Sequence, residues 1–197
     1  MQKRLALASN SKHKQKEFQS LFSPFGIEIL LPVDLNIAFS PEETDNTFLG
    51  NSFIKSKELH KLTGLPSIAD DSGISVYALQ HDPGVFSARY GKPEFSDRDR
   101  ALYLLENMKG QDDRRAYYTC VLTYVDSTNE LSFEGKVFGE ISEDYDENNL
   151  YGFGYDPIFY YPPFAKRFSE VPEKEKNKVS HRKIALDNFL LWFQSQK

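Results

Sequence analysis

The chain has 197 residues, 40% hydrophobic and 27% charged, a composition typical of globular proteins that excludes disordered, collagen-like and coiled-coil classes. Its 24 Lys and Arg residues and 29 Asp and Glu residues give a net charge of −5, which argues against binding duplex nucleic acid through general basicity. The longest stretches without charge, such as residues 72–81 and 116–125, span only ten residues, too few for a membrane helix of about 20.

Two further features favour a location in the cytoplasm. The apolar run near the N-terminus, residues 5–8, is too short for the apolar region of a signal peptide. The single cysteine, Cys120, can form no internal disulfide and excludes a multi-cysteine metal site. We therefore expect a cytoplasmic protein that binds neither a membrane nor nucleic acid.

The first part of the chain predicts strands that alternate with helices. Apolar residues recur at strand or helix spacing, and glycine, proline and polar residues separate the segments. In chain order the expected elements are a strand at 3–8, a helix after the polar loop 9–11, a strand at 27–33, a helix at 44–63, and a strand from 67 that ends in a sharp turn at 70–73.

The second part predicts one well-marked helix and one hairpin. Ser96 and Asp99 form a capping pair for a helix that stops at Gly110. Strands at 117–125 and 131–137 flank a turn, and Ser180 precedes a C-terminal helix with a broad apolar face. Together the segments predict a mixed α/β sheet packed by helices, in a single domain of residues 1–197.

A candidate phosphate-binding loop follows the first strand. Ser9, Asn10, Ser11, Lys12, His13 and Lys14 are consecutive and open a helix. The N–H dipoles of a helix N-terminus and lysine ammonium groups both attract phosphate. The loop lacks the glycine patterns of P-loop and dinucleotide sites. An ordinary helix cap with solvated lysines explains the same residues.

Acidic residues occur in two places that could supply metal ligands. Asp70 and Asp71 precede Gly73, and Glu42 and Glu43 precede the second helix. Adjacent carboxylates are costly to bring together unless a divalent cation or lysines lie between them. Each pair also has an explanation without a metal. The aspartates could belong to an ordinary turn at 70–73, and the glutamates could complement the dipole of the second helix.

Two later segments could bind a nucleobase. Phe153, Gly154, Tyr155 and Asp156 lie within a glycine- and proline-bounded turn, where glycine allows close approach of a ligand and an aromatic ring allows stacking. Lys176 and the Ser180-His181-Arg182 segment carry donors suited to a carbonyl oxygen or a phosphate. A turn with core aromatics and a solvated helix start are the alternatives. Taken together, the segments suit a nucleoside triphosphate with Mg²⁺.

Five segments of this chain, in the same order, resemble the inosine triphosphate pyrophosphatase family. They are residues 7–14, 69–73, 83–90, 152–157 and 180–182. The resemblance implies an elongated α/β fold, with a mixed β-sheet flanked by helices and two lobes with a central cleft, as a homodimer. It implies hydrolysis of ITP, dITP and XTP to the monophosphate and pyrophosphate with Mg²⁺, which cleanses the nucleotide pool.

The resemblance also implies roles for particular residues. Asp71 and Lys14 are expected to be catalytic, with Asp71 as the base and Asp71 and Glu42 as metal contacts; Glu43 is the alternative to Glu42. The expected substrate-binding residues are Ser9, Asn10, Ser11, Lys12, His13, Lys14, Ser72, Phe153, Gly154, Tyr155, Asp156, Lys176, His181 and Arg182. Ser11 stands where the family motif, Ser/Thr-x-Asn-x-x-Lys, has asparagine.

Two other functions are compatible with parts of the sequence. Maf-like nucleotide pyrophosphatases share the architecture, but their first motif is richer in arginine, and residues 152–157 and 180–182 are of the inosine triphosphatase type. A nucleotide-binding module without turnover is the other alternative, for which Ser11 is the one hint. Pyrophosphate release from ITP with and without Mg²⁺ separates binding from catalysis.

Overall fold

The computed structural model describes residues 3–196 and contains a seven-stranded sheet in the order β2-β1-β3-β4-β5-β6-β7. Its strands are β1 (Lys3–Leu7), β2 (Ile27–Leu30), β3 (Ser67–Val76), β4 (Arg115–Val125), β5 (Glu130–Ile141), β6 (Phe159–Tyr161) and β7 (Lys166–Arg167). β1 pairs in parallel with β2 and β3, whereas β6 pairs antiparallel with β5 and β7. The predicted mixed α/β sheet is confirmed.

Five α-helices accompany this sheet in the described part of the chain. They are α1 (Lys12–Phe22), α2 (Phe48–Thr63), α3 (Asp97–Asn107), α4 (Glu173–Lys176) and α5 (His181–Ser195). α3 has the predicted capping box, because the Asp99 N–H donates to Ser96 Oγ at 3.2 Å and the Ser96 N–H donates to Asp99 Oδ2 at 2.9 Å. Such a cap stabilises a helix by about 1 kcal/mol.

The chain forms two compact units, as the predicted two lobes require. The first unit contains the chain up to Asp71, Cys120–Gly135, and the chain from Arg182 onward. The second contains Ser72–Thr119 and Lys136–His181. β3, β4 and β5 each contribute residues to both units. The single domain of residues 1–197 stays a prediction.

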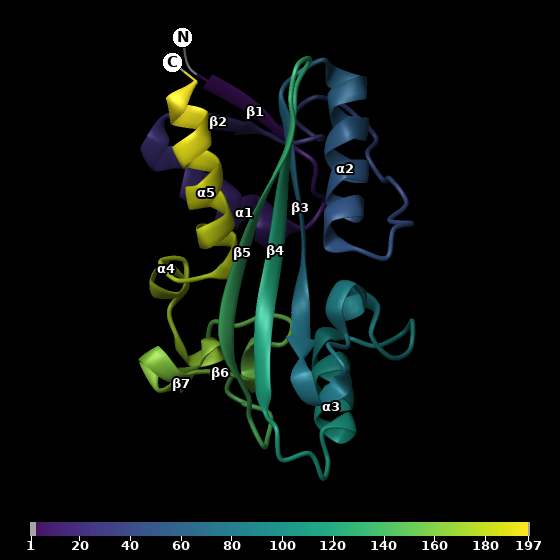
Figure 1. Cartoon of the computed structure of the whole chain (residues 1–197), viewed down its shortest axis with the longest axis vertical. Helices are drawn as coiled ribbons and strands as arrows, with labels where there is room; N and C mark the ends of the chain where they lie inside the picture. The colour runs from purple at the N-terminus through teal and green to yellow at the C-terminus, as the bar shows by residue number, and fades with distance from the viewer. Residues whose placement is uncertain (1–2, 197) are drawn as a thin grey trace. The chain divides into compact units, whose positions relative to one another are not determined.

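In the first unit, helices cover both faces of the sheet (Figure 1). Side chains along a strand alternate between faces, so Leu5 and Leu7 pack in the cluster that contains α1 and α5, whereas Ala6 and Ala8 pack with Leu59 of α2. Burying each of these leucines stabilises the fold by roughly 1.5 to 3 kcal/mol. The small alanines leave room for α2 close to the strand.

The structure corrects the prediction of a turn at residues 70–73, because β3 runs through this segment without a break. Gly73 allows a close approach between segments of the second unit. A Cβ atom at position 73 would lie 2.3 Å from Ser87 Oγ and 2.4 Å from the Gly84 carbonyl oxygen. The glycine therefore makes room for a neighbouring segment, and the two aspartates before it are strand residues.

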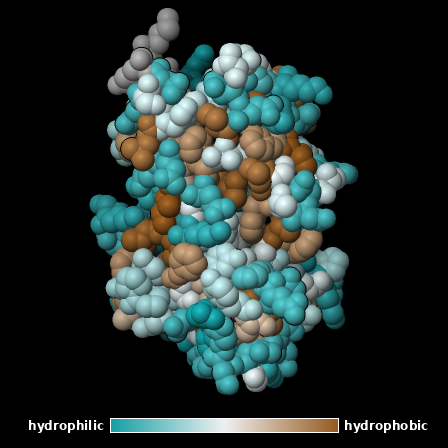
Figure 2. Space-filling view, viewed as in Figure 1, coloured by the Kyte–Doolittle hydropathy of each residue, from teal (hydrophilic) through white to brown (hydrophobic). Residues whose placement is uncertain are grey.

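The second unit has an aromatic core of its own. Tyr118, Phe159 and Phe168 are buried together with Leu104 and Met108, which belong to α3 and the residue after it. Figure 2 shows a face of the molecule on which apolar patches alternate with hydrophilic side chains.

None of the helices in the described residues is both long enough and apolar enough to cross a membrane.

Candidate active site

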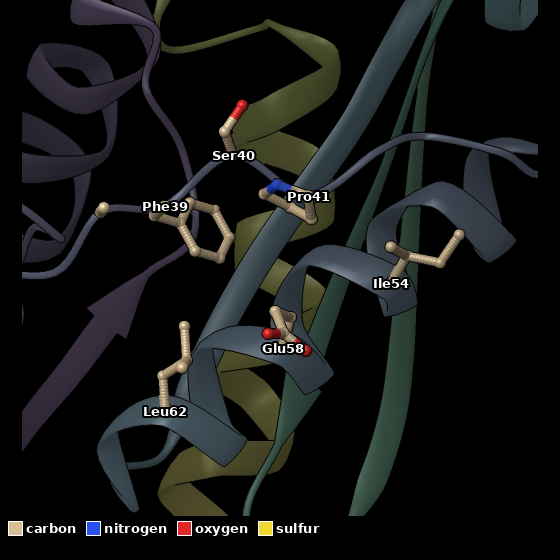
Figure 3. Close-up of a pocket in the computed structure, with 7 residues that line it drawn as sticks. Phe39, Ser40, Pro41, Ile54, Glu58 and Leu62 are labelled. Atoms are coloured by element: carbon tan, nitrogen blue, oxygen red, sulfur yellow. The ribbon is translucent and has the colours of Figure 1, made fainter.

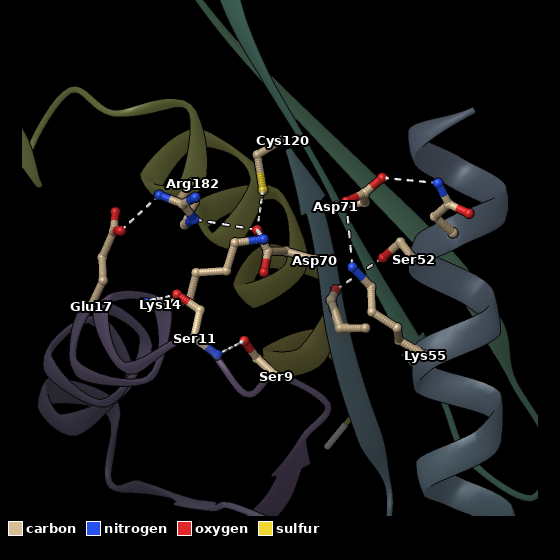
Figure 4. Close-up of polar contacts among 12 residues, drawn as sticks. Ser9, Ser11, Lys14, Glu17, Ser52, Lys55, Asp70, Asp71, Cys120 and Arg182 are labelled. Carbon is tan, nitrogen blue, oxygen red and sulfur yellow. Dashed lines mark hydrogen bonds and ion pairs between the residues drawn. The ribbon is translucent and has the colours of Figure 1, made fainter. Parts of the chain in front are cut away.

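The two adjacent aspartates of β3 point to opposite faces of the sheet, as neighbouring strand residues must (Figure 4). Asp70 contacts residues of α1 and α5, and Asp71 contacts residues of α2. The two carboxylates therefore pair with different cations: Lys14 and Arg182 pair with Asp70, and Lys55 pairs with Asp71.

Asp70 binds two cations with one of its oxygens. Lys14 Nζ lies 2.9 Å and Arg182 Nε 3.3 Å from Asp70 Oδ2, and Arg182 Nη1 lies 2.8 Å from Glu17 Oε2. The side chains of Asp70, Arg182 and Glu17 are 0%, 4% and 6% exposed. Asp70 Oδ1 is buried and has no hydrogen-bond partner among the described residues. Two positive and two negative groups thus form a buried cluster without net charge.

The charges of this cluster shift the pKa values of its members. Burial alone would raise the pKa of the Asp70 carboxyl, but the charges of Lys14, Arg182 and Lys55 outweigh burial and hold its pKa well below the usual range. Burial likewise opposes the charge of Arg182, but Glu17 and Asp70 raise the pKa of its guanidinium. Both groups are therefore ionised at neutral pH.

Asp71 lies against the face of α2 that carries Asn51 and Lys55, which are one helical turn apart. Lys55 Nζ lies 3.4 Å from Asp71 Oδ1 and 2.7 Å from Glu43 Oε1. Asn51 Nδ2 lies 3.5 Å from Asp71 Oδ2, and Asn51 Oδ1 accepts from the Asp45 N–H at 2.9 Å. Because the backbone N–H fixes the amide oxygen, the amide nitrogen must face Asp71.

Burial raises the pKa of the Asp71 carboxyl, and the charges of Glu43 and Asp70 add to the rise, while Lys55 and Lys14 oppose it. For Lys55, burial would lower the pKa of the ammonium, but the charges of Asp71, Asp70 and Glu43 outweigh burial and raise it. Asp71 is therefore a carboxylate with a raised pKa beside a cationic lysine.

Hydroxyl groups fix α2 against the sheet. Ser52 Oγ donates to the Ala69 carbonyl oxygen at 3.2 Å, and Thr123 Oγ1 lies 2.9 Å from both Ser52 Oγ and Ser56 Oγ. These groups are fully buried, so each unmade hydrogen bond would cost roughly 1 to 3 kcal/mol. The network sets the position at which Asn51 and Lys55 meet Asp71.

The predicted phosphate loop leads into α1 as expected. Ser11 is the N-cap, and its Oγ accepts from the Lys14 N–H at 3.5 Å. Ser9 Oγ accepts from the Ser11 N–H at 3.3 Å, and Asn10 Nδ2 donates to the Phe39 carbonyl oxygen at 2.6 Å. Lys12 and His13 are exposed. Of this loop, the side chain of Lys14 is the one that reaches Asp70.

In the second unit, Asp156 organises the predicted base-binding segment. Asp156 Oδ2 accepts from the Phe153 N–H at 3.0 Å and lies 2.5 Å from Lys176 Nζ. The same ammonium lies 4.9 Å from the centroid of the Phe153 ring. Gly154 has a φ of +59°, which favours glycine. Tyr155 is buried and donates to the Ser87 carbonyl oxygen at 2.8 Å.

The remaining predicted residues lie in different surroundings. His181 is 4% exposed, and its ring stacks on Tyr118 with 4.8 Å between centroids. Ser72 is half-buried in β3, and Glu42 is exposed. Glu42 as a metal contact stays a prediction, but it is Glu43 that Lys55 connects to Asp71.

Three residues around Asp70 and Asp71 were not predicted as site residues: Glu17, which pairs with Arg182, and Asn51 and Lys55, which contact Asp71. The sequence holds a weak signal for two of them, because Asn51 and Lys55 are four residues apart on the predicted helix 44–63 and so share one face. Within residues 3–196 no three His, Cys, Asp or Glu side chains form a group that could hold a metal ion by themselves.

A pocket of about 380 Å³ lies on another side of α2. Figure 3 shows Phe39, Ser40 and Pro41 passing opposite Ile54, Glu58 and Leu62 of the helix. None of the predicted site residues lines it. The polar clusters described above are therefore distinct from this pocket.

Comparison with known proteins agrees with the resemblance drawn from the five sequence segments. The "dITP/XTP pyrophosphatase" of Leptospira biflexa is 65% identical over 193 residues, which cover 98% of each chain. The protein of that name from Leptospira interrogans is 54% identical over 196 residues, which cover both chains completely. The solved structure of the Staphylococcus aureus Ham1 protein is 34% identical and covers 99% of this chain and 100% of that one, with a TM-score of 0.88. The model of the Ham1 family matches residues 5–192, and the chain belongs to this family.

Proposed function

We propose that this chain is a hydrolase that converts ITP, dITP and XTP to the monophosphate and pyrophosphate, and so removes non-standard purine nucleotides from the nucleotide pool. Two full-length relatives, 65% and 54% identical, carry the name dITP/XTP pyrophosphatase. The observation that carries the proposal is the pair of adjacent aspartates on β3, which point to opposite faces of the sheet. Lys14 pairs with Asp70 on one face, and Lys55 pairs with Asp71 on the other face.

We assign phosphate binding to the N-terminus of α1. The N–H groups in the first turn of a helix lack partners within the helix, and the helix dipole favours an anion there. Lys14 adds a positive charge whose position Asp70 fixes. The proposed triphosphate-binding residues are Ser9, Asn10, Ser11, Lys12, His13 and Lys14, with Ser72 as a further substrate contact.

We assign activation of the attacking water to Asp71. A general base works best when its pKa is not far below the working pH, and burial raises the pKa of Asp71 above that of an exposed aspartate. Asn51 and Lys55 hold its two oxygens, so the carboxylate has a fixed direction. General-base catalysis contributes about 10²- to 10⁴-fold to a rate.

The acidic residues on the α2 face fit Mg²⁺. Asp71 and Glu43 are close enough to share the Lys55 ammonium, and Mg²⁺ needs one or two carboxylates together with phosphate oxygens and waters. When bound, Mg²⁺ neutralises charge on the phosphates and on the leaving pyrophosphate. Asp71 is the first proposed ligand, and Glu43 suits the second position better than Glu42 does.

We assign nucleoside binding to the second unit. Phe153 and Gly154 provide a ring and an open backbone for a base, Lys176 holds an ammonium above that ring, and Asp156 fixes both. The donors of Lys176 and His181 suit the 6-carbonyl of hypoxanthine or xanthine. They would meet the 6-amino group of adenine donor to donor, at a cost of about 1 to 3 kcal/mol for each donor left unpaired. Tyr155 and Arg182 stay predicted substrate contacts, although both are buried and hydrogen-bonded within the protein.

Pyrophosphate release from ITP, XTP, dUTP, GTP and ATP, with Mg²⁺ and with EDTA, tests the proposal. We expect turnover of ITP and XTP to exceed that of ATP and to stop with EDTA. Asp71→Asn should lower kcat at least ~100-fold. The matched control is Asp187→Asn, which alters a half-exposed carboxylate of α5 that pairs with Lys183 and should leave kcat unchanged.

Three results would contradict this assignment. A preference for dUTP would favour a Maf-like activity. Binding of ITP without pyrophosphate release would make the chain a nucleotide-binding module. Near-normal kcat in Asp71→Asn would remove Asp71 from the role of base.

We further propose that the enzyme works in the cytoplasm as a homodimer. The proposal of a dimer rests on the family resemblance of the five sequence segments. Light scattering coupled to gel filtration should give about twice the 22.7 kDa of one chain, and a monomer mass would contradict it.

A further inference from the structure

A buried tyrosine of β4 connects two segments of the second unit that are far apart in sequence. The Tyr118 hydroxyl donates to Asp156 Oδ1 at 3.3 Å. The Tyr118 ring stacks on His181, with 4.8 Å between centroids and 9° between planes. Asp156 and His181 belong to the proposed nucleoside-binding residues, and Tyr118 itself was not among the predicted site residues.

The hydroxyl contact determines how the Asp156 carboxylate is turned. Asp156 Oδ2 already accepts from the Phe153 N–H at 3.0 Å and from Lys176 Nζ at 2.5 Å. A carboxylate held at one oxygen can still rotate, because its terminal torsion is broad. The Tyr118 hydroxyl holds the second oxygen, so the positions of Phe153 and Lys176 depend on it through Asp156.

The ring contact determines how His181 is turned. Tyr118 is packed against Phe159 at 4.7 Å between centroids and lies nearly parallel to Phe168, at 14° between planes. Its own ring therefore cannot tilt freely. A stacked imidazole follows the plane of its partner, so the stack sets the directions in which the two ring nitrogens of His181 point.

We propose that Tyr118 is a positioning residue for base recognition, which orients Asp156 through its hydroxyl and His181 through its ring. This inference rests on the proposed function, since it concerns how the nucleoside is bound. It predicts that the base, and not the phosphates, is bound more weakly when Tyr118 is changed.

The test separates the hydroxyl from the ring and both from general core stability. Tyr118→Phe removes the hydroxyl and keeps the stack, and Tyr118→Leu removes both. The matched control is Tyr124→Phe. Tyr124 is a buried tyrosine of the same strand whose hydroxyl donates to Asp126 Oδ2 at 2.7 Å, and Asp126 is not a predicted site residue.

We expect Tyr118→Phe to raise the KM for ITP about three- to tenfold, as loss of one hydrogen bond does, with kcat within about twofold of wild type. The inhibition constant of IMP should rise in parallel, and that of inorganic pyrophosphate, which lacks a base, should not change. Tyr118→Leu should raise the KM roughly threefold further or more. Tyr124→Phe should leave all three constants unchanged, whatever its effect on the Tm.

Two outcomes would overturn the inference while the proposed function stands. One is a Tyr118→Phe enzyme with wild-type KM and IMP inhibition but a lowered Tm, which would make Tyr118 a core residue only. The other is equal weakening of IMP and pyrophosphate. A wild-type protein that binds IMP but hydrolyses no triphosphate would instead overturn the proposed function, and weaker IMP binding by Tyr118→Phe would still support the inference.

Discussion

Lys55 is the cation on which the carboxylates of the α2 face depend, since it contacts both Asp71 and Glu43 and its side chain is 10% exposed. Lys55→Met leaves the two carboxylates without it, so we expect the free energy of unfolding to fall by about 1.5 to 3 kcal/mol. Mg²⁺ should reverse part of this loss, because it would replace the missing positive charge. Thermal unfolding with and without MgCl₂ measures both effects.

Lys57→Met is the matched control, because Lys57 lies two residues along the same helix and pairs with Glu130 at the surface, with side chains 49% and 56% exposed. Surface pairs of this kind contribute about 0 to 1 kcal/mol. Equal losses in both variants would contradict the special role of the Lys55 charge, because Lys57 pairs only at the surface.

The charge of Asp70 makes the stability of the first unit depend on pH. Its pKa lies below the value of 3.8 for an unperturbed aspartate, mainly because Lys14 and Arg182 outweigh the effect of burial. The ionised form therefore stabilises the fold above about pH 4, and this contribution is lost as the pH falls further. Asp70→Asn should cost about 3 kcal/mol at pH 7, and the difference from wild type should shrink below pH 4. Urea unfolding at a series of pH values tests this, and a difference independent of pH would contradict it.

At the scale of elements, the sequence predicts those helix ends and turns that are fixed by contacts between residues close in sequence. The α3 capping box is made by Ser96 and Asp99, three residues apart, and both residues are visible in the sequence. The hairpin turn is closed by the Asp126 N–H and the Asn129 carbonyl oxygen at 3.0 Å. α2 begins at Phe48 and not at residue 44, because Thr47 caps it and accepts from the Gly50 N–H.

The prediction failed for β3 because its polar residues are compensated from far away. Adjacent aspartates followed by serine and glycine are typical of a turn. The groups that neutralise Asp70 and Asp71 are Lys14 of α1, Lys55 of α2 and Arg182 of α5, which all lie outside β3 and its neighbouring residues in sequence. Periodicity cannot reveal such partners, so a charged buried strand looks like a loop in sequence.

The same reason limits how much of the site the sequence predicts. Lys14 and Asp71 lie in segments whose composition indicates phosphate and metal chemistry, and the structure places both in the two polar clusters of β3. Glu17 and Lys55 look like ordinary polar residues of amphipathic helices. Their roles become visible only when the tertiary fold buries them beside Arg182 and Asp71.

At the scale of the whole molecule, the division into two compact units does not follow the order of the chain. The boundaries fall within β3, between Asp71 and Ser72, within β4, between Thr119 and Cys120, and within β5, between Gly135 and Lys136. Unfolding one unit alone would end all three strands in mid-length, so the residues at each break would lose the ordered neighbours that continue their own strands.

We therefore expect one cooperative unfolding transition, as the predicted single domain of residues 1–197 requires. The chain has a single tryptophan, Trp192, which packs against Tyr124 and Phe133 in the first unit. Its fluorescence reports on that unit, whereas far-ultraviolet circular dichroism reports on the secondary structure of both. The two signals should give the same urea midpoint, because coincident probes are the mark of a two-state transition. If fluorescence changed at a lower or higher urea concentration than circular dichroism, the units would be separate folding domains despite the strands that join them.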